Sequence, residues 1–151
     1  MGNWLLPLPA CRSVPPCPHA RVVLITPLRL RVQQTYVRPE SFRFCDLFSN
    51  LLRRFSLLMY FRDSRDPGTD FSGLVEKSQH VRLERAELRW EEWARYSWRQ
   101  RQKMLMGGLL GSFELGTASL GPLWPHLWLG QFTHAGKGAT MGLGGYAVLA
   151  A

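Results

Sequence analysis

Isoleucine and asparagine are almost absent from this 151-residue chain, since isoleucine occurs once and asparagine twice. Lysine is scarce as well, because sixteen of the nineteen basic residues are arginine. This bias is typical of GC-rich coding DNA and identifies no function. The three cysteines, Cys11, Cys17 and Cys45, are too few for a disulfide framework in a chain of this length. The gap between Cys11 and Cys17 also exceeds the spacing of a zinc knuckle, so we predict no metal site.

Acidic residues are missing altogether from residues 1–39, which hold five arginines and seven of the ten prolines. Prolines at this density oppose helix and sheet alike, so one interpretation is a disordered leader. The other is an organelle-targeting segment, because transit peptides are rich in arginine and poor in acids. The net charge of +8 suits an anionic partner such as lipid headgroups, nucleic acid or an acidic protein surface.

The segment after this leader is dense in apolar side chains that recur at helical spacing, opposite polar ones. We therefore predict an amphipathic helix over residues 40–62, which lies on a membrane surface or covers a partner. An Asp-Pro-Gly turn with charges of alternating sign predicts a linker over residues 63–72.

A long, charged helix rich in arginine and tryptophan is predicted over residues 73–103. No glycine or proline interrupts this stretch after Gly73, and Glu91 and Arg95 form an i,i+4 pair of favourable order. From Trp93 to Lys103 the chain carries four cations and no anion. The end of the predicted helix is therefore strongly basic.

Residues 104–121 form an apolar run of eighteen residues with one ionisable side chain. As a helix with a rise of ~1.5 Å per residue, the run would cover about 27 Å, close to the ~30 Å hydrocarbon thickness of a bilayer. Tryptophans flank it, and basic residues crowd its amino-terminal side, while residues 115–136 hold no Lys or Arg. We predict a transmembrane helix with the charged helix on the cytoplasmic or matrix side. The predicted interface anchors are Arg95, Trp98, Arg99, Arg101, Lys103, Trp124 and Trp128.

Small residues fall into stripes on this predicted span. A loop over residues 122–134 then leads to a second hydrophobic segment, residues 135–151, which also has a small face. Such faces let helices approach closely in lipid, so we expect the two segments to pack as a hairpin, with Glu114 shielded from lipid or protonated. The predicted helix-packing residues are Gly107, Gly108, Gly111, Ser112, Glu114, Gly116, Ala118, Gly138, Gly142 and Gly145.

No set of residues in the sequence indicates catalysis or cofactor binding. The stretch "GKGAT" has the composition of a phosphate-binding loop, but the spacing of its glycines does not fit one. His126 and His134 lie in an apolar setting without a nearby cysteine, and Glu114 has no evident partner acid or base. We predict a protein that is not an enzyme, with no cofactor and no small-molecule substrate.

The two apolar segments are similar to those of a known family. The stretches "LMGGLLGSF", "LGQF" and "AGKGATMGL", preceded by a basic flank, resemble the mitochondrial reactive oxygen species modulator family over residues 103–148. That family includes a small subunit associated with the inner-membrane presequence translocase. The resemblance implies a glycine-rich helical hairpin in the mitochondrial inner membrane and a role beside the import channel.

The fold class predicted from the sequence is an all-α membrane protein, in which a glycine-rich transmembrane hairpin follows a disordered leader, an amphipathic helix and a long charged helix. The predicted function is that of an accessory subunit in protein transport, with a transit peptide and with the bilayer and other membrane subunits as partners. One alternative is a peripheral module whose Arg/Trp helix binds nucleic acid or acidic protein. Five acidic residues on that helix make nucleic acid the less favoured ligand. The other alternative is a membrane protein restricted to one lineage.

Overall fold

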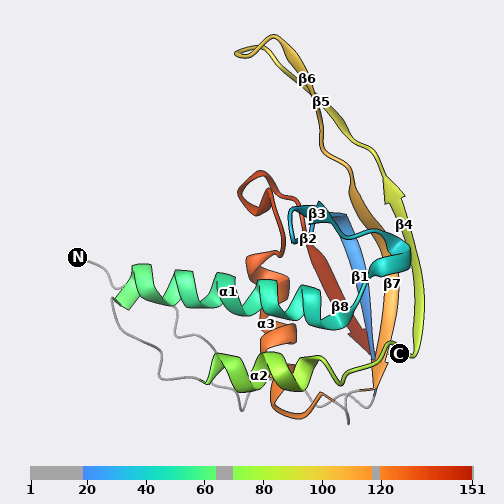
Figure 1. The fold of residues 1–151 in the computed structure, drawn as a ribbon, viewed down its shortest axis with the longest axis vertical. Helices are drawn as coiled ribbons and strands as arrows, with labels where there is room; N and C mark the ends of the chain where they lie inside the picture. The colour runs from blue at the N-terminus through green and yellow to red at the C-terminus, as the bar shows by residue number, and fades with distance from the viewer. Residues whose placement is uncertain (1–18, 64–69, 117–119, 151) are drawn as a thin grey trace.

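The computed structural model describes residues 19–63, 70–116 and 120–150. A four-stranded antiparallel sheet, in the order β4–β7–β1–β8, forms one layer of the fold. The helices lie against one face of this sheet (Figure 1). The sheet strands are β1 (His19–Leu28), β4 (Arg85–Glu91), β7 (Gly108–Gly116) and β8 (Tyr146–Ala150). The α-helices of the described residues are α1 (Phe44–Asp63), α2 (Phe71–Ser78) and α3 (Trp124–Thr133).

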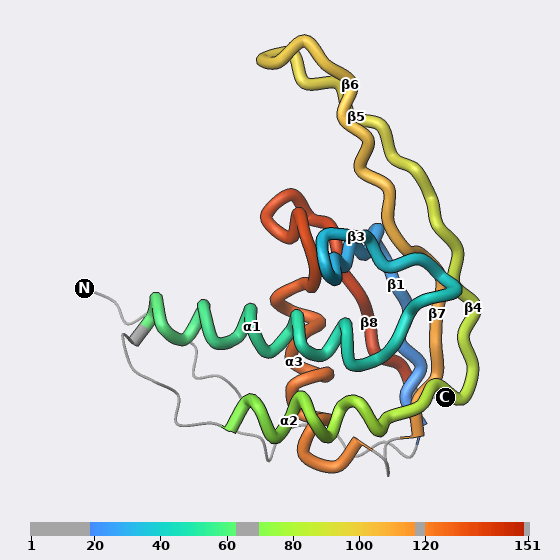
Figure 2. Tube along the Cα trace, in the orientation of Figure 1, coloured from blue at the N-terminus to red at the C-terminus, as the bar shows by residue number. Residues whose placement is uncertain are grey.

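Two short hairpins add to this frame. Strands β2 (Arg31–Val32) and β3 (Thr35–Tyr36) pair just after β1. Strands β5 (Ala94–Ser97) and β6 (Gln102–Leu105) form an arm that rises beyond the sheet from the ends of β4 and β7 (Figure 2). Without these hairpins the element order is β-α-β-β-α-β, with α1 and α2 together in the first helical position. This order and the strand arrangement define a ferredoxin-like fold.

The core lies between the helices and the inner face of the sheet. Along β1, side chains alternate between buried and more exposed positions, as expected for a strand with one covered face. Ala20, Val22 and Leu24 point into the core, whereas Ile25 is 62% exposed. The apolar side of α1 covers these residues, with Phe48 fully buried. The predicted disordered leader is therefore wrong from residue 19 onward, and residues 1–18 lie outside the described part.

Helix α1 occupies most of the segment for which the sequence predicts an amphipathic helix, residues 40–62. Its apolar side chains do not need a membrane, because the sheet and α3 bury them. The buried residues of α1 are Phe44, Cys45, Leu47, Phe48, Leu51 and Leu52. After these residues the helix extends past the body, where Leu57 and Phe61 are exposed. The predicted linker, residues 63–72, lies largely outside the described residues.

The long charged helix predicted over residues 73–103 does not form. Helix α2 ends at Ser78, and the chain then enters β4 and β5. Every residue of β4 pairs with β7, from Arg85 opposite Glu114 to Glu91 opposite Gly108. The i,i+4 spacing of Glu91 and Arg95 is a weak local preference, and the sheet pairing overrides it.

The predicted transmembrane hairpin is also wrong, and with it the all-α fold class. Within this predicted span, residues 104–105 end β6 and residues 108–116 form β7, a central strand paired on one side with β1 and on the other with β4. Such a strand is covered on one face and paired along both edges, so its sequence is apolar without being helical. In the second predicted segment, residues 135–150 comprise a loop and β8. Within the described residues, none of the helices has both the length and the apolar character needed to cross a bilayer.

Gly111 illustrates why the small residues of this run are not a helix-packing face. Its φ is +118°, and an added Cβ would overlap the carbonyl oxygen of Glu87 on β4. Here the register of β1 against β7 is also irregular, between Leu24 and Leu28. The glycine therefore serves a close approach of neighbouring strands, and lipid plays no part in it.

Candidate functional site

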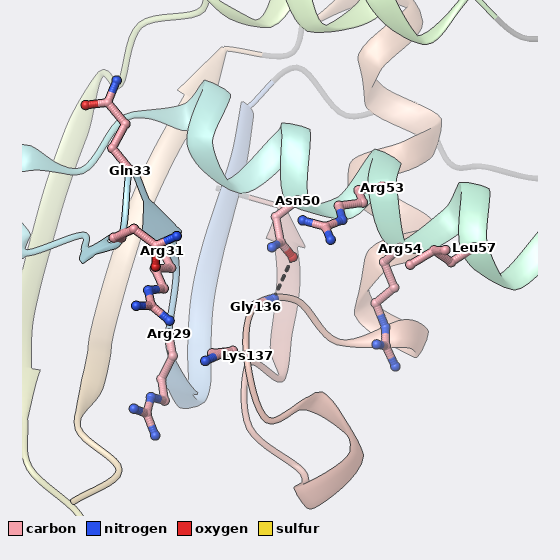
Figure 3. A pocket seen from close by; sticks show the side chains of 10 residues that line it. Arg29, Arg31, Gln33, Asn50, Arg53, Arg54, Leu57, Gly136 and Lys137 are labelled. Carbon is pink, nitrogen blue, oxygen red and sulfur yellow. Dashed lines mark hydrogen bonds between the residues drawn. The ribbon is translucent and has the colours of Figure 1, made fainter.

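A basic cleft of about 510 Å³ opens between α1, the β2–β3 hairpin and the loop of residues 134–145, which joins α3 to β8 (Figure 3). Half of the described residues that line it are cationic, and none of them is Asp, Glu or His. The cleft is lined by Arg29, Arg31, Gln33, Gln34, Asn50, Arg53, Arg54, Leu57, Gly136 and Lys137. We call this surface the basic cleft.

Helix α1 holds the loop in place through two side chains. The amide N–H of Gly136 donates to Oδ1 of Asn50 at 2.7 Å, the bond drawn in Figure 3. One turn further on, Nε of Arg54 donates to the carbonyl oxygen of Thr133 at 2.7 Å, at the end of α3. This second bond satisfies a carbonyl of a helix terminus. The loop is therefore fixed by the same helix that supplies cations to the cleft.

The irregular end of β1 holds the other side of the loop. The amide of Lys137 donates to the carbonyl oxygen of Arg29 at 2.8 Å, and the amide of Gly144 donates to that of Pro27 at 2.9 Å. The Thr26 hydroxyl donates to the carbonyl oxygen of Gly142 at 2.7 Å and also accepts from the amide of Gly145 at 2.8 Å. The last residues of β1 and Arg29 after it thus bind the loop through two backbone carbonyls and one hydroxyl.

Tyr36 of β3 contacts two arginines, Arg29 just after β1 and Arg31 on β2. The guanidinium of Arg29 lies 4.8 Å from the Tyr36 ring centroid, and its Nη2 donates to the Tyr36 hydroxyl at 2.9 Å. The guanidinium of Arg31 lies 5.9 Å from the same ring. Cation–π contacts of this kind hold arginine side chains without neutralising them. The positive charge of the cleft is therefore positioned but not cancelled by carboxylates.

The histidines singled out in the sequence lie outside the cleft lining. His126 packs against the rings of Phe48 and Phe55, at centroid distances of 6.0 and 6.1 Å, and burial lowers its pKa. Nδ1 of His134 lies 3.1 Å from the carbonyl oxygen of Leu143, across the base of the loop. Both imidazole rings therefore contact residues of the fold, and neither lines the basic cleft. Within the described ranges, no three His, Cys, Asp or Glu side chains converge as metal ligands.

The predicted site residues are distributed over several elements, none of them a membrane helix. Gly107 directly precedes β7, and Ala118 lies outside the described residues. The predicted packing residues on β7 are Gly108, Gly111, Ser112, Glu114 and Gly116. Those in the loop before β8 are Gly138, Gly142 and Gly145. Because these elements are a strand and a loop, the residues present no common helix face.

The predicted interface anchors separate into two groups. Trp124 and Trp128 lie on α3. The others lie on or between β5 and β6, and they are Arg95, Trp98, Arg99, Arg101 and Lys103. Sequence reasoning missed the basic cleft, because its cations come from residues 29–31, 53–54 and 137. Lys137 in its glycine-rich stretch is a signal in the sequence, but the spacing of the glycines does not fit a phosphate-binding loop.

The chain thus has a ferredoxin-like fold and a cleft lined by five cations and, among the described residues, by no carboxylate. A family model described as CRISPR-associated endoribonuclease Cas6 matches residues 22–146. The chain therefore belongs to the Cas6 family of CRISPR-associated endoribonucleases. A search of curated proteins by sequence found no match.

Solved structures of Cas6 proteins share the fold. Thermus thermophilus Cas6 is 17% identical, with a TM-score of 0.61 over 92% of this chain and 56% of that one. A Cas6 product complex is 14% identical, with a TM-score of 0.63 over 92% and 54% of the two chains. A partial Cas6-RT-Cas1–Cas2 complex is 18% identical, with a TM-score of 0.60 over 92% and 23%. This chain therefore spans about half the length of the first two and about a quarter of the third.

The family match overturns the functional expectations drawn from the sequence. The resemblance to the mitochondrial reactive oxygen species modulator family is wrong, because it depended on glycine patterns that belong here to a strand and a loop. The predicted accessory subunit, its transit peptide and its part in protein transport are wrong with it. The chain belongs to a family of endoribonucleases, which contradicts the predictions that it is not an enzyme and that nucleic acid is an unlikely partner. The inner-membrane location depended on the same resemblance and on spans that do not form.

Proposed function

We propose that this chain binds RNA in the basic cleft and serves as the phosphate-binding module of an endoribonuclease. The observation that carries this proposal is the gathering of five cations, from three separate elements, in one cleft whose lining has no carboxylate. Lys/Arg contacts to phosphates supply most of the affinity of nucleic-acid binding. The family to which the chain belongs gives the class of reaction, cleavage of RNA.

The uncharged side chains of the cleft lining also suit an RNA ligand. Gln33 and Gln34, in the β2–β3 turn, offer amide donors and acceptors beside Arg31. Such groups can hydrogen-bond ribose hydroxyls and base edges, which distinguish RNA from a simple anion. The spread of cations over α1, the β2–β3 hairpin and the loop matches several successive phosphates better than a single one.

The chemistry that these residues can perform is electrostatic. When a phosphodiester is cleaved, negative charge builds up on its non-bridging oxygens and on the leaving oxygen, and fixed cations stabilise that charge. Arginine adds bidentate geometry to this stabilisation, which positions the phosphate as well. The lining holds no His, Asp or Glu. We therefore assign its residues to binding and charge stabilisation, and we assign none of them to proton transfer.

Binding is tested with fluorescently labelled RNA and fluorescence anisotropy. Arg31 and Arg53 are exposed in the cleft, so Arg31→Gln with Arg53→Gln should remove charge without disturbing the core. We expect the double variant to bind RNA at least about tenfold more weakly, whatever the sequence, since charge-assisted hydrogen bonds contribute roughly 1.5–3 kcal/mol each. The slope of log affinity against log salt should become shallower by about 0.7–0.9 per lost phosphate contact.

Arg82→Gln is the matched control, because Arg82 is exposed between α2 and β4 and does not line the cleft. It should change the affinity by less than about twofold. If the control and the double variant bind RNA equally well, the cleft is not the binding site. Cleavage of end-labelled RNA on a denaturing gel tests the second half of the proposal. If this chain binds RNA but leaves it intact, the binding role stands and the ribonuclease role of this chain falls.

A further inference from the structure

The β5–β6 arm exposes aromatic rings without any covering layer. Trp98 at its turn is 85% exposed and Tyr96 is 49% exposed. On the opposite strand, all four residues of β6 are exposed, and Leu105 reaches 64%. The arm stands clear of the helices and extends beyond the end of the sheet (Figures 1 and 2). A two-stranded hairpin has little stability of its own, and these exposed rings bury little surface within it. The fold therefore does not account for their exposure.

The strand register places these rings on one face of the arm. Tyr96 pairs with Lys103, and Ala94 pairs with Leu105, so these four side chains share a face. Trp98 continues that face at the turn, because its ring centroid lies 4.9 Å from that of Tyr96 in an edge-to-face contact. One side of the arm therefore presents two aromatic rings beside a lysine.

The arm is also purely cationic. Between Trp93 and Met106 the sequence contains no acidic residue. Its cations are Arg95, Arg99, Arg101 and Lys103. None of the salt bridges found among the described residues involves them. The charge on the arm is therefore available to a partner.

The arm and the basic cleft are connected through the same loop. Nη1 of Arg95 contacts Sδ of Met141 at 3.5 Å. Met141 lies in the loop of residues 134–145, whose Lys137 lines the cleft. The end of β4 below the arm also contacts the hairpin beside the cleft, since the ring centroid of Trp90 lies 6.3 Å from that of Tyr36 on β3. An RNA strand leaving the cleft along the loop would thus reach the arm.

We propose that the arm binds unpaired bases of the RNA whose backbone is held in the basic cleft, a proposal that rests on the function proposed above. Trp98 and Tyr96 stack on the bases, and the four cations contact the adjacent phosphates. Aromatic side chains stack on bases whose faces are free, which a continuous duplex does not provide. The substrate class that follows is an RNA with a single-stranded segment next to the portion bound in the cleft.

A protein partner is the competing occupant of the arm. Interface cores do contain tryptophan and arginine, but they are depleted in charged residues as a group. Four cations among twelve residues, without a single carboxylate, match a phosphate backbone better than an apolar protein surface. An RNA-binding measurement on arm variants distinguishes RNA from a protein as the partner of the arm.

The experiment compares two RNAs of equal length by anisotropy, a hairpin with a single-stranded flank and a blunt, fully paired duplex. Replacing a stacked aromatic residue with alanine weakens nucleic-acid binding by roughly 5- to 150-fold per base. We therefore expect Trp98→Ala to weaken binding of the flanked RNA by that factor, and binding of the duplex by less than about twofold. Trp98→Phe should restore part of the loss. The salt slope should stay unchanged, because no charge is removed.

Phe132→Ala is the matched control, since Phe132 is an exposed aromatic residue, 70% accessible, on α3. It should bind both RNAs as the unaltered chain does. If Trp98→Ala binds the flanked RNA normally while the Arg31/Arg53 double variant is impaired, the cleft proposal stands and the arm proposal is overturned in favour of a protein partner. An equal loss on both RNAs would also overturn it, because base stacking would not be the cause. If the unaltered chain binds neither RNA, the function proposed for the cleft has failed first.

Discussion

At the scale of single residues, two glycines of the loop before β8 share a backbone conformation and differ in their surroundings. Gly144 has φ +72° and Gly142 has φ +85°, both in the left-handed region. An added Cβ at Gly144 would overlap the carbonyl oxygen of Ala135, whereas at Gly142 it would meet nothing within 4 Å. Replacing each glycine with alanine therefore distinguishes the cost of a left-handed backbone alone from the added cost of a steric overlap.

We expect Gly142→Ala to lower the free energy of unfolding by about 1–2 kcal/mol, the strain of a left-handed residue that is not glycine. Gly144→Ala should lower it by roughly 3 kcal/mol or more, because the backbone must also move away from Ala135. Urea denaturation followed by circular dichroism measures both. Equal losses for the two variants would show that the loop does not pack on Ala135 as described.

Tyr146 on β8 is a second residue whose surroundings have a measurable consequence. Its ring is 2% exposed, and its hydroxyl donates to the carbonyl oxygen of Leu127 on α3 at 2.6 Å. Burial raises the pKa of this phenol well above its ordinary value of 10.0. The folded chain therefore keeps the proton at a pH where the unfolded chain has lost it.

It follows that the contribution of Tyr146 is complete below pH 10 and is lost as the pH rises above it, by up to about 1.4 kcal/mol per pH unit. Tyr146→Phe should cost about 1–2 kcal/mol near neutral pH through the lost hydrogen bond. The difference between the two proteins should then shrink above pH 10. Urea denaturation at pH 7 and pH 10.5 gives both values, and a difference independent of pH would contradict the burial of the hydroxyl.

At the scale of elements, the β5–β6 arm is separable from the body. Its strand residues are exposed or, in the case of Ser97, half-buried, and the buried core begins again only at Met106. Because Ala94 and Leu105 are paired, replacing residues 95–104 with Asn-Gly should close β4 and β7 with a tight two-residue turn. The shortened chain should unfold within about 1 kcal/mol of the original, since no core contact is lost.

The same deletion should weaken binding of a flanked RNA at least as much as Trp98→Ala does, because it removes both rings and all four cations. Anisotropy and urea denaturation of one protein sample give the two readouts. A shortened chain that no longer unfolds cooperatively would show that the arm supports the body. A shortened chain that binds RNA as tightly as the original would show that the arm takes no part in binding.

Elements also show where sequence reasoning succeeds and where it does not. Helical periodicity around Leu47, Phe48, Leu51 and Leu52 is local information, and a helix does form there. Residues 74–103 hold many strong helix formers and no proline, yet they contain β4 and β5. The strand conformation of β4 depends on pairing with residues 108–114, which no local pattern reveals.

At the scale of the whole molecule, the order of the sheet creates the site. β1 lies between β7 and β8, so the irregular end of the first strand meets the loop before the last one. Helix α1 crosses this junction and adds Asn50, Arg53 and Arg54 to it (Figure 3). Residues separated by more than eighty positions thereby line one cleft. This chain spans about half the length of those two solved Cas6 chains.

The sequence by itself determined the strong positive charge, the helical periodicity of α1 and the cationic, aromatic character of the stretch from Trp93 to Met106. These are properties of composition or of neighbouring residues, so they survive in any fold. Only the tertiary structure decided that the apolar run from Gly108 to Gly116 is a central strand. An apolar segment satisfies its backbone polar groups equally well as a membrane helix or between two strands, and its neighbours in space make the choice. The basic cleft likewise exists only after folding, because its cations are brought together by the sheet order and not by the chain.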